Sequence, residues 1–159
     1  MKLANLPHSD SDFAGDLSNS KSTTGYVILV NNNVLHWLSR QQAYVSHSSC
    51  AAEYIAMAEL AEDLIWLSQL LTAIGIKYTK PICVWGDNEA QISLTTTLTN
   101  HRLRGVRVSY HLLKDEAKKG TFDIQWIDGK LNVADIFTKS LPHDRFISLR
   151  DLLVSPVIK

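Results

Sequence analysis

Four carboxylates stand in or beside apolar segments of this 159-residue chain, far apart in the sequence. They are Asp10, Glu53, Asp87 and Asp135. Burying a carboxylate is costly unless it is paired, hydrogen-bonded or bound to a cation. Four carboxylates that converge would form a site for hard divalent cations such as Mg²⁺, which prefers oxygen ligands. Two such ions about 3.5–4 Å apart can clamp a phosphodiester for hydrolysis.

Glu53 has the strongest local signal, because it lies on the apolar face of its own helix. Apolar residues in the segment 48–74 recur at spacings of three and four, and Glu53 fills the one gap in that pattern. Glu59 and Glu62 fall on the opposite side, where solvated charges belong. The helix dipole favours an acid near the N-terminus, which explains the position of Glu53 along the helix but not its face. The pattern therefore favours a functional role for this residue.

The other three acids are ambiguous from local pattern alone. Asp87 follows a predicted buried strand, where α/β sheets form binding sites, but Asp is also a preferred helix N-cap. For Asp135, a place in the first turn of a helix is explanation enough. Asp10 and Asp12 would point to the same face of a strand, so periodicity does not choose between them.

Composition limits the classes of protein that this chain can be. Its 45% hydrophobic and 20% charged residues are typical of one globular domain. A formal net charge of zero disfavours an autonomous nucleic-acid binder, but not a module delivered to nucleic acid by a neighbouring domain. Cys50 and Cys83 cannot build a disulfide framework or a zinc site. Because no secretory or membrane-spanning segment is present, we expect a soluble intracellular protein.

The predicted elements place the acids on a mixed sheet. Pro7 makes a first strand within 6–13 weak or places it near an edge. Pro142 breaks the last helical segment. The remaining elements follow in order: a hairpin around Asn31–Asn33, a helix at 48–74, a strand at 81–85, helices at 88–98 and 106–119, a strand at 121–127 and mostly helix at 131–153. This order predicts an α/β fold with helices on the faces of the sheet.

Motifs at and between the acids resemble the ribonuclease H domain at the C-terminal end of copia-type retrotransposon polyproteins. The matching segments are SDSDFAGD, KSTTGYVILV, VLHWLSRQQ, SSCAAEY, GDNEA, YHLL and NVADIFTKSLP, in that order. They cover about 9–153, almost the whole chain. The resemblance implies a single ribonuclease H-like domain over 1–159 with a core of about 6–153. It also implies a five-stranded mixed sheet with helices on both faces.

The same resemblance implies an endonuclease that hydrolyses the RNA strand of RNA–DNA hybrids with two Mg²⁺ ions, for which Mn²⁺ would substitute. Position by position, it assigns catalysis and metal binding to Asp10, Glu53, Asp87 and Asp135, and so prefers the first acid of the SDSD motif over Asp12. It implies an adjoining reverse transcriptase domain, and a location in the cytoplasm or in a virus-like particle. Ser48 and Asn88, beside two of the acids, are predicted to touch the hybrid.

A second hypothesis is a catalytically idle ribonuclease H-like module, in a decayed or domesticated copy, that tethers a polymerase or serves as a binding surface. It is motivated by the zero net charge and by the stretch RLRGVRVSYH at 102–111. There Gly105 and Arg107 replace the His and Asp that are usual in the family. An integrase or transposase core shares the fold, but it typically uses three acids and lacks the acid of the SSxxAEY helix, so it ranks below both.

Overall fold

The computed structural model describes residues 7–31, 33–78, 80–89 and 111–154. Five strands form one sheet in the order β3-β2-β1-β4-β5. They are β1 (His8–Asp12), β2 (Thr23–Val30), β3 (Asn33–Gln41), β4 (Ile82–Gly86) and β5 (Phe122–Trp126). The pairs β1–β2 and β2–β3 are antiparallel, whereas β1–β4 and β4–β5 are parallel. The sheet is therefore mixed and five-stranded, as the sequence predicted.

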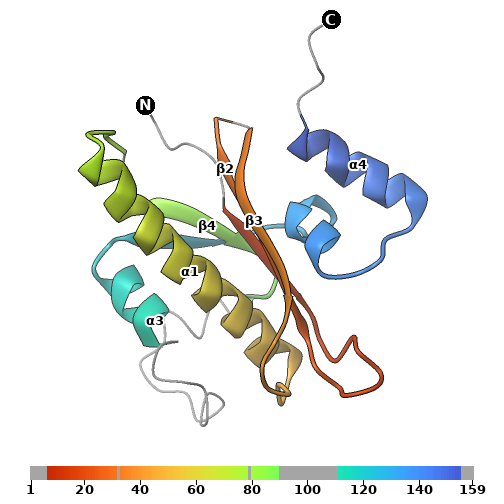
Figure 1. Ribbon diagram of the computed structural model, residues 1–159. Helices are drawn as coiled ribbons and strands as arrows, with labels where there is room; N and C mark the ends of the chain where they lie inside the picture. Colours follow the sequence, from red (N-terminus) through yellow and green to blue (C-terminus); the bar gives the residue numbers. More distant parts are fainter. Residues whose placement is uncertain (1–6, 32, 79, 90–110, 155–159) are drawn as a thin grey trace, which may run out of the picture.

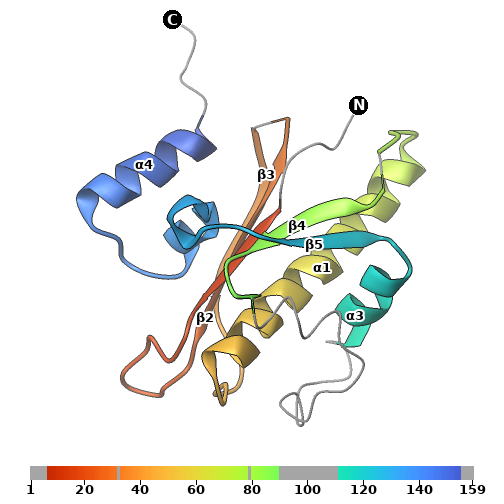
Figure 2. The same ribbon diagram turned by 180° about the vertical axis from the view of Figure 1, so that it is seen from behind.

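Helices cover both faces of this sheet. The long helix α1 (Ser49–Ala73) and the shorter α3 (His111–Lys118) pack together on one face, as Figures 1 and 2 show from opposite sides. On the other face the chain forms the 3₁₀ turns η3 (Gly129–Leu131) and η4 (Val133–Phe137), followed by α4 (His143–Leu153). The α/β fold with helices on both faces is thus confirmed.

Strand β2 shows how one sheet builds two hydrophobic cores. Tyr26 and Ile28 pack into the core beneath α1, whereas Val27 and Leu29 pack into the core beneath η4 and α4. Successive side chains of a strand point to opposite faces, so a strand buried on both sides reads as a continuous apolar run. The run TGYVILV is such a strand.

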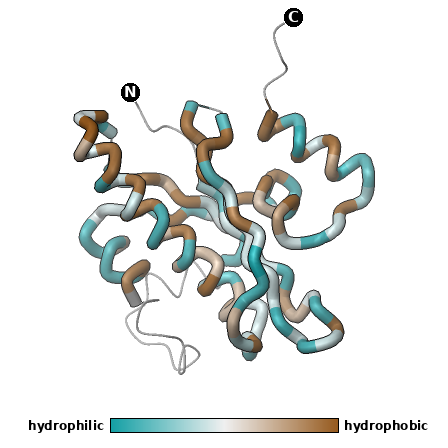
Figure 3. The backbone as a smooth tube through the Cα atoms, in the orientation of Figure 1, coloured by the Kyte–Doolittle hydropathy of each residue, from teal (hydrophilic) through white to brown (hydrophobic). Residues whose placement is uncertain are grey.

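Helix α1 agrees with its predicted bounds to within one residue. The hydroxyl of its N-cap, Ser48, accepts a hydrogen bond from the Ala51 N–H at 3.1 Å. Beyond its last turn, Gly75 has φ +75°, a conformation that glycine adopts without strain. Hydrophobic and hydrophilic segments alternate along its trace in Figure 3, as expected for a helix with one buried face. Glu53 lies on that buried face.

Two expectations about position are wrong. Strand β1 lies at the centre of the sheet, not near an edge. Pro7 directly precedes it, where the missing N–H costs no ladder bond, and its carbonyl accepts from the Trp85 N–H at 2.8 Å. Glu59 is half-buried instead of solvated, and it pairs with Arg40 of β3 at 3.2 Å.

The C-terminal region begins as 3₁₀ turns and becomes α-helical only at α4, with Pro142 at the break as predicted.

The predicted helix at 88–98 lies almost entirely outside the described residues. Residues 106–110 of the predicted helix at 106–119 and the atypical positions Gly105 and Arg107 also lie outside them. Among the described residues, no helix has both the length and the apolarity needed to cross a membrane.

Candidate metal centre

Three of the four singled-out acids meet in space. One carboxylate oxygen from each of Asp10, Glu53 and Asp87 lies within 4.8 Å of the others. Asp10 and Glu53 are buried and Asp87 is half-buried. Around an octahedral Mg²⁺ with bonds of about 2.1 Å, opposite oxygens are about 4.2 Å apart. The three-acid cluster therefore offers the ligand type of a hard divalent cation, with oxygens close to the spacing that such an ion needs.

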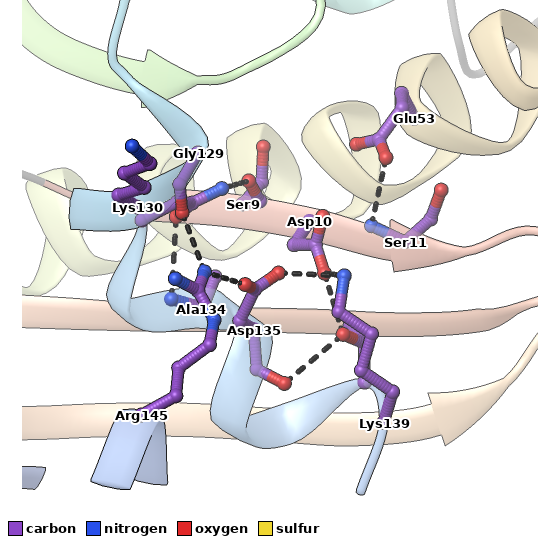
Figure 4. Close-up of polar contacts among 12 residues, drawn as sticks. Ser9, Asp10, Ser11, Glu53, Gly129, Lys130, Ala134, Asp135, Lys139 and Arg145 are labelled. Atoms are coloured by element: carbon purple, nitrogen blue, oxygen red, sulfur yellow. Dashed lines mark hydrogen bonds and ion pairs between the residues drawn. The ribbon is translucent and has the colours of Figure 1, made fainter. Parts of the chain in front are cut away.

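The three acids come together because β1 and β4 pair over a short length. Their ladder contains a single register pair, His8 with Trp85. Asp10, in the middle of β1, and Asp87, directly after the end of β4, each follow that pair by two residues. Both therefore lie on the carboxyl side of the parallel ladder, where α/β sheets form sites. Glu53 approaches from α1, and its Oε1 accepts the Ser11 N–H at 3.1 Å (Figure 4).

A glycine opposite Asp10 lets the other face of the sheet approach. Gly25 is the cross-strand partner of Asp10 in the β1–β2 ladder. A Cβ on Gly25 would lie 2.4 Å from Cγ2 of Thr138 and 3.0 Å from the Phe137 carbonyl carbon, so a larger residue would force the chain at 137–138 to shift. With glycine there, the Thr138 hydroxyl donates a hydrogen bond to the Asp10 carboxylate.

Asn132 ties that segment to β1. Its buried amide donates to the Ser9 carbonyl at 2.9 Å, while its Oδ1 accepts the Ala134 N–H at 3.2 Å as the N-cap of η4. These bonds satisfy a buried polar side chain and fix the start of the 3₁₀ turn. As a result Asp135, three residues on, is buried beside β1.

Asp135 lies next to the three-acid cluster but has a different environment. Its Oδ1 is 2.7 Å from the Lys139 ammonium, and its Oδ2 is bound by the Arg145 guanidinium. Lys139 also lies 3.4 Å from Oδ2 of Asp10. Figure 4 shows the ammonium next to both carboxylates. The structure thus links Asp135 to Asp10 through a cation of the protein itself.

The loop at 128–131 supports Asp87. The indole N–H of Trp126 donates to the Asp87 carbonyl at 3.1 Å, and a Cβ on Gly129 would lie 3.0 Å from Oδ2 of Asp87. Arg145 donates to the Gly129 carbonyl at 2.7 Å. One guanidinium therefore anchors both the loop beside Asp87 and the carboxylate of Asp135.

The electrostatics of the four acids follow from these contacts. Burial raises the pKa of Asp10 to about 6, even though Thr138 and Lys139 oppose the shift. Burial, and then the negative charges of Asp10 and Asp87, raise the pKa of Glu53 well above its ordinary value. Burial also raises the pKa of Asp87. Burial would raise the pKa of Asp135 too, but its bonds to Lys139 and Arg145 lower it overall. A divalent cation would relieve the repulsion within the three-acid cluster.

The two predicted substrate contacts flank this cluster. Ser48 is exposed, with its hydroxyl engaged as the N-cap of α1, and Asn88 is half-buried directly after Asp87. Their contact with a hybrid stays a prediction. Sequence reasoning missed Thr138, Lys139 and Arg145. A signal existed for Lys139, because it stands four residues after Asp135, the spacing of a helical ion pair.

Several relatives of this chain are retrotransposon polyproteins. It is 31% identical over 147 residues to the retrovirus-related Pol polyprotein from transposon TNT 1-94 of Nicotiana tabacum, covering 92% of this chain and 11% of the relative. It is 30% identical over 140 residues to the retrovirus-related Pol polyprotein from transposon RE1 of Arabidopsis thaliana. That alignment covers 87% of this chain and 10% of the relative. The chain thus spans about a tenth of the length of the curated relatives it matches. No protein-family model matches it.

Solved structures with the same fold are ribonucleases H. LC11-RNase H1, isolated from compost, aligns with a TM-score of 0.60 at 18% identity over 84% of this chain and 91% of that one. The same enzyme has also been solved in complex with an RNA/DNA hybrid. The N-terminal RNase H domain of Rv2228c from Mycobacterium tuberculosis aligns with a TM-score of 0.57 at 15% identity. The alignment covers 92% of this chain and 95% of that domain's chain. The polyprotein relatives and the shared fold show that this chain belongs to the ribonuclease H domains of copia-type retrotransposon Pol polyproteins.

Proposed function

We propose that this domain is a metal-dependent endonuclease that hydrolyses the RNA strand of RNA–DNA hybrids during reverse transcription. The observation that carries the proposal is that one carboxylate oxygen each from Asp10 of β1, Glu53 of α1 and Asp87 after β4 lie within 4.8 Å of one another. The hybrid bound to LC11-RNase H1 supports the substrate, and the polyprotein relatives support an adjoining reverse transcriptase. On this proposal the whole chain is one domain.

In this proposal Asp10, Glu53 and Asp87 would hold one Mg²⁺ or Mn²⁺, and Asp10 and Asp135 would hold a second. The bound ions would lower the pKa of a water molecule and stabilise the leaving 3′ oxygen. The chain's own groups orient the ligands: the Ser11 N–H holds Glu53, and the Thr138 hydroxyl holds Asp10. Ser48 and Asn88 contact the hybrid, whose groove shape and 2′-hydroxyls provide selectivity.

The test is cleavage of a hybrid with a labelled RNA strand by the purified chain. We expect internal cuts in the RNA with Mg²⁺ or Mn²⁺, none with EDTA, and none in RNA–RNA or DNA–DNA duplexes of the same sequence. Glu53→Gln should abolish the cuts. Glu62→Gln is the matched control, because it removes the same charge from an exposed position of α1.

The outcome also decides between this proposal and an idle tether. Folded protein that binds the hybrid but does not cut it with either metal would contradict the nuclease. Hybrid binding equal in the wild type and Glu53→Gln would then favour a binding module. Circular dichroism should accompany each assay, so that a loss of folding is not scored as a loss of activity.

A further inference from the structure

A positive charge of the chain itself contacts two of the four acids. The Lys139 ammonium is 2.7 Å from Oδ1 of Asp135 and 3.4 Å from Oδ2 of Asp10 (Figure 4). The two carboxylates are only 3% and 5% exposed, whereas the lysine side chain is 37% exposed. The ammonium thus contacts two buried acids, although the lysine side chain itself is partly open to solvent.

The same two carboxylates are the pair that the proposed function assigns to the second metal ion. Both oxygens of Asp135 are already bound by cations, Oδ1 by Lys139 and Oδ2 by Arg145. A metal ion that bridged Asp10 and Asp135 would need oxygens that the ammonium now contacts. A divalent cation and an ammonium cannot share that space, because like charges repel strongly at such distances.

We propose that Lys139 is a built-in cation that occupies the Asp10–Asp135 half of the site and competes with the second metal ion. The three-acid cluster then takes the first ion, and the Asp10–Asp135 pair takes a second only when the ammonium withdraws. This inference rests on the proposed function and deepens it. Lys139 acts as a positioning residue that sets the order of ion binding.

The geometry allows this exchange. The contact of Lys139 with Asp10 is longer than its contact with Asp135, so Asp10 can turn to an ion in the three-acid cluster while the lysine stays on Asp135. A lysine carries its charge on a flexible four-carbon stem, so the ammonium can swing out without moving the backbone. Arg145 still holds Asp135 when it does, because it binds the other oxygen and the Gly129 carbonyl.

The test is the number and affinity of Mn²⁺ ions bound by the whole chain, measured by isothermal titration calorimetry without nucleic acid. Lys139→Met keeps an unbranched apolar stem and removes the charge. Lys119→Met is the matched control, because Lys119 also pairs with an acid at 2.7 Å but lies on the surface after α3. We expect one Mn²⁺ for the wild type and for Lys119→Met, and two for Lys139→Met. The second ion should bind at least tenfold more tightly than any second ion in the wild type.

An independent readout is the electron paramagnetic resonance spectrum at saturating Mn²⁺. Two ions held about 4 Å apart give a spin-coupled signal, which we expect for Lys139→Met and not for the wild type at the same concentration. Circular dichroism and thermal unfolding establish that each variant is folded.

The outcomes separate this inference from the proposed function. If the wild type and Lys139→Met bind Mn²⁺ alike, whether one ion or two, and Glu53→Gln weakens that binding, the competition is wrong and the metal site stands. If no folded variant binds Mn²⁺, both are wrong. A second ion that appears in Lys119→Met as strongly as in Lys139→Met would also contradict the inference, because general charge would then be the cause.

Discussion

In one half of the acid site Asp135 lies between Lys139 and Arg145, whereas in the other half Asp10, Glu53 and Asp87 bring three carboxylates together. Burial acts on all four acids in the same direction. The pKa of Asp135 is nevertheless lowered, while the pKa values of the other three are raised. The difference comes from cations that the chain places next to Asp135.

This contrast separates two uses of a buried acid. An acid clamped by an arginine and a lysine is charge-compensated within the chain, and removing one partner leaves charge uncompensated. Three acids whose carboxylates repel one another make the protein less stable until an external cation binds, as is common at functional sites. The two halves should therefore respond in opposite ways to neutralising mutations, pH and metal.

The largest effect should come from neutralising an acid of the three-acid cluster. Loss of one ligand that holds the ion costs several kcal/mol of transition-state stabilisation, so Glu53→Gln should lower the rate of hybrid cleavage about 10³-fold. Glu62→Gln should leave the rate within about twofold, since an exposed helix acid contributes little. Single-turnover cleavage in Mg²⁺ measures both. A Glu53→Gln enzyme that cuts at more than a tenth of the wild-type rate would contradict the assignment.

The pH dependence of stability should show the strain of the same cluster. The pKa of Asp10 rises from 3.8 to about 6 on folding, so the folded state holds its proton more tightly than the unfolded state. Stability in EDTA should then fall as pH rises from 4 to 6, by about 3 kcal/mol from this group. Urea unfolding at several pH values, with Asp10→Asn as the reference, measures it. If the free energy of unfolding depends on pH in the same way in the wild type and in Asp10→Asn, the raised pKa of Asp10 is contradicted. Added Mg²⁺ should reduce the loss of stability at pH 7.

The clamped half should be sensitive to its arginine. Arg145→Met removes one cation from Asp135 and the donor to the Gly129 carbonyl. We expect the free energy of unfolding to fall by about 2 kcal/mol, less than for a fully uncompensated buried charge because Lys139 remains. Urea unfolding at pH 7 in EDTA gives the value. A neutral or stabilising result would mean that Asp135 resembles the other three acids after all.

The smallest loss of stability should come from an exposed ion pair, which serves as the reference for the buried clamp on Asp135. Arg150 pairs with Asp151 at 2.6 Å, but the two side chains are 46% and 61% exposed. Solvent screening and side-chain entropy reduce such a pair, so Arg150→Gln should cost less than about 0.5 kcal/mol. The same urea titration applies. A cost as large as that of Arg145→Met would show that burial is not what distinguishes the Asp135 clamp.

Several features of the fold were predictable because they are encoded locally. The helix α1 and the hairpin of β2 and β3 follow from periodicity and turn residues, and the buried face of Glu53 follows from the same pattern. The central position of β1 and the burial of Glu59 were not predictable in this way. The first depends on which strands pair, and the second on contacts with other elements, among them Arg40 of β3.

The sequence by itself identified the four acids as candidates, and family resemblance chose Asp10 over Asp12. Only the tertiary structure divided them into a three-acid cluster and a clamped aspartate. The reason is that an acid's environment depends on residues remote in the chain: Thr138 and Lys139 contact Asp10 across 128 and 129 positions. Periodicity shows which face a side chain occupies, but strand pairing and packing decide which charges meet there.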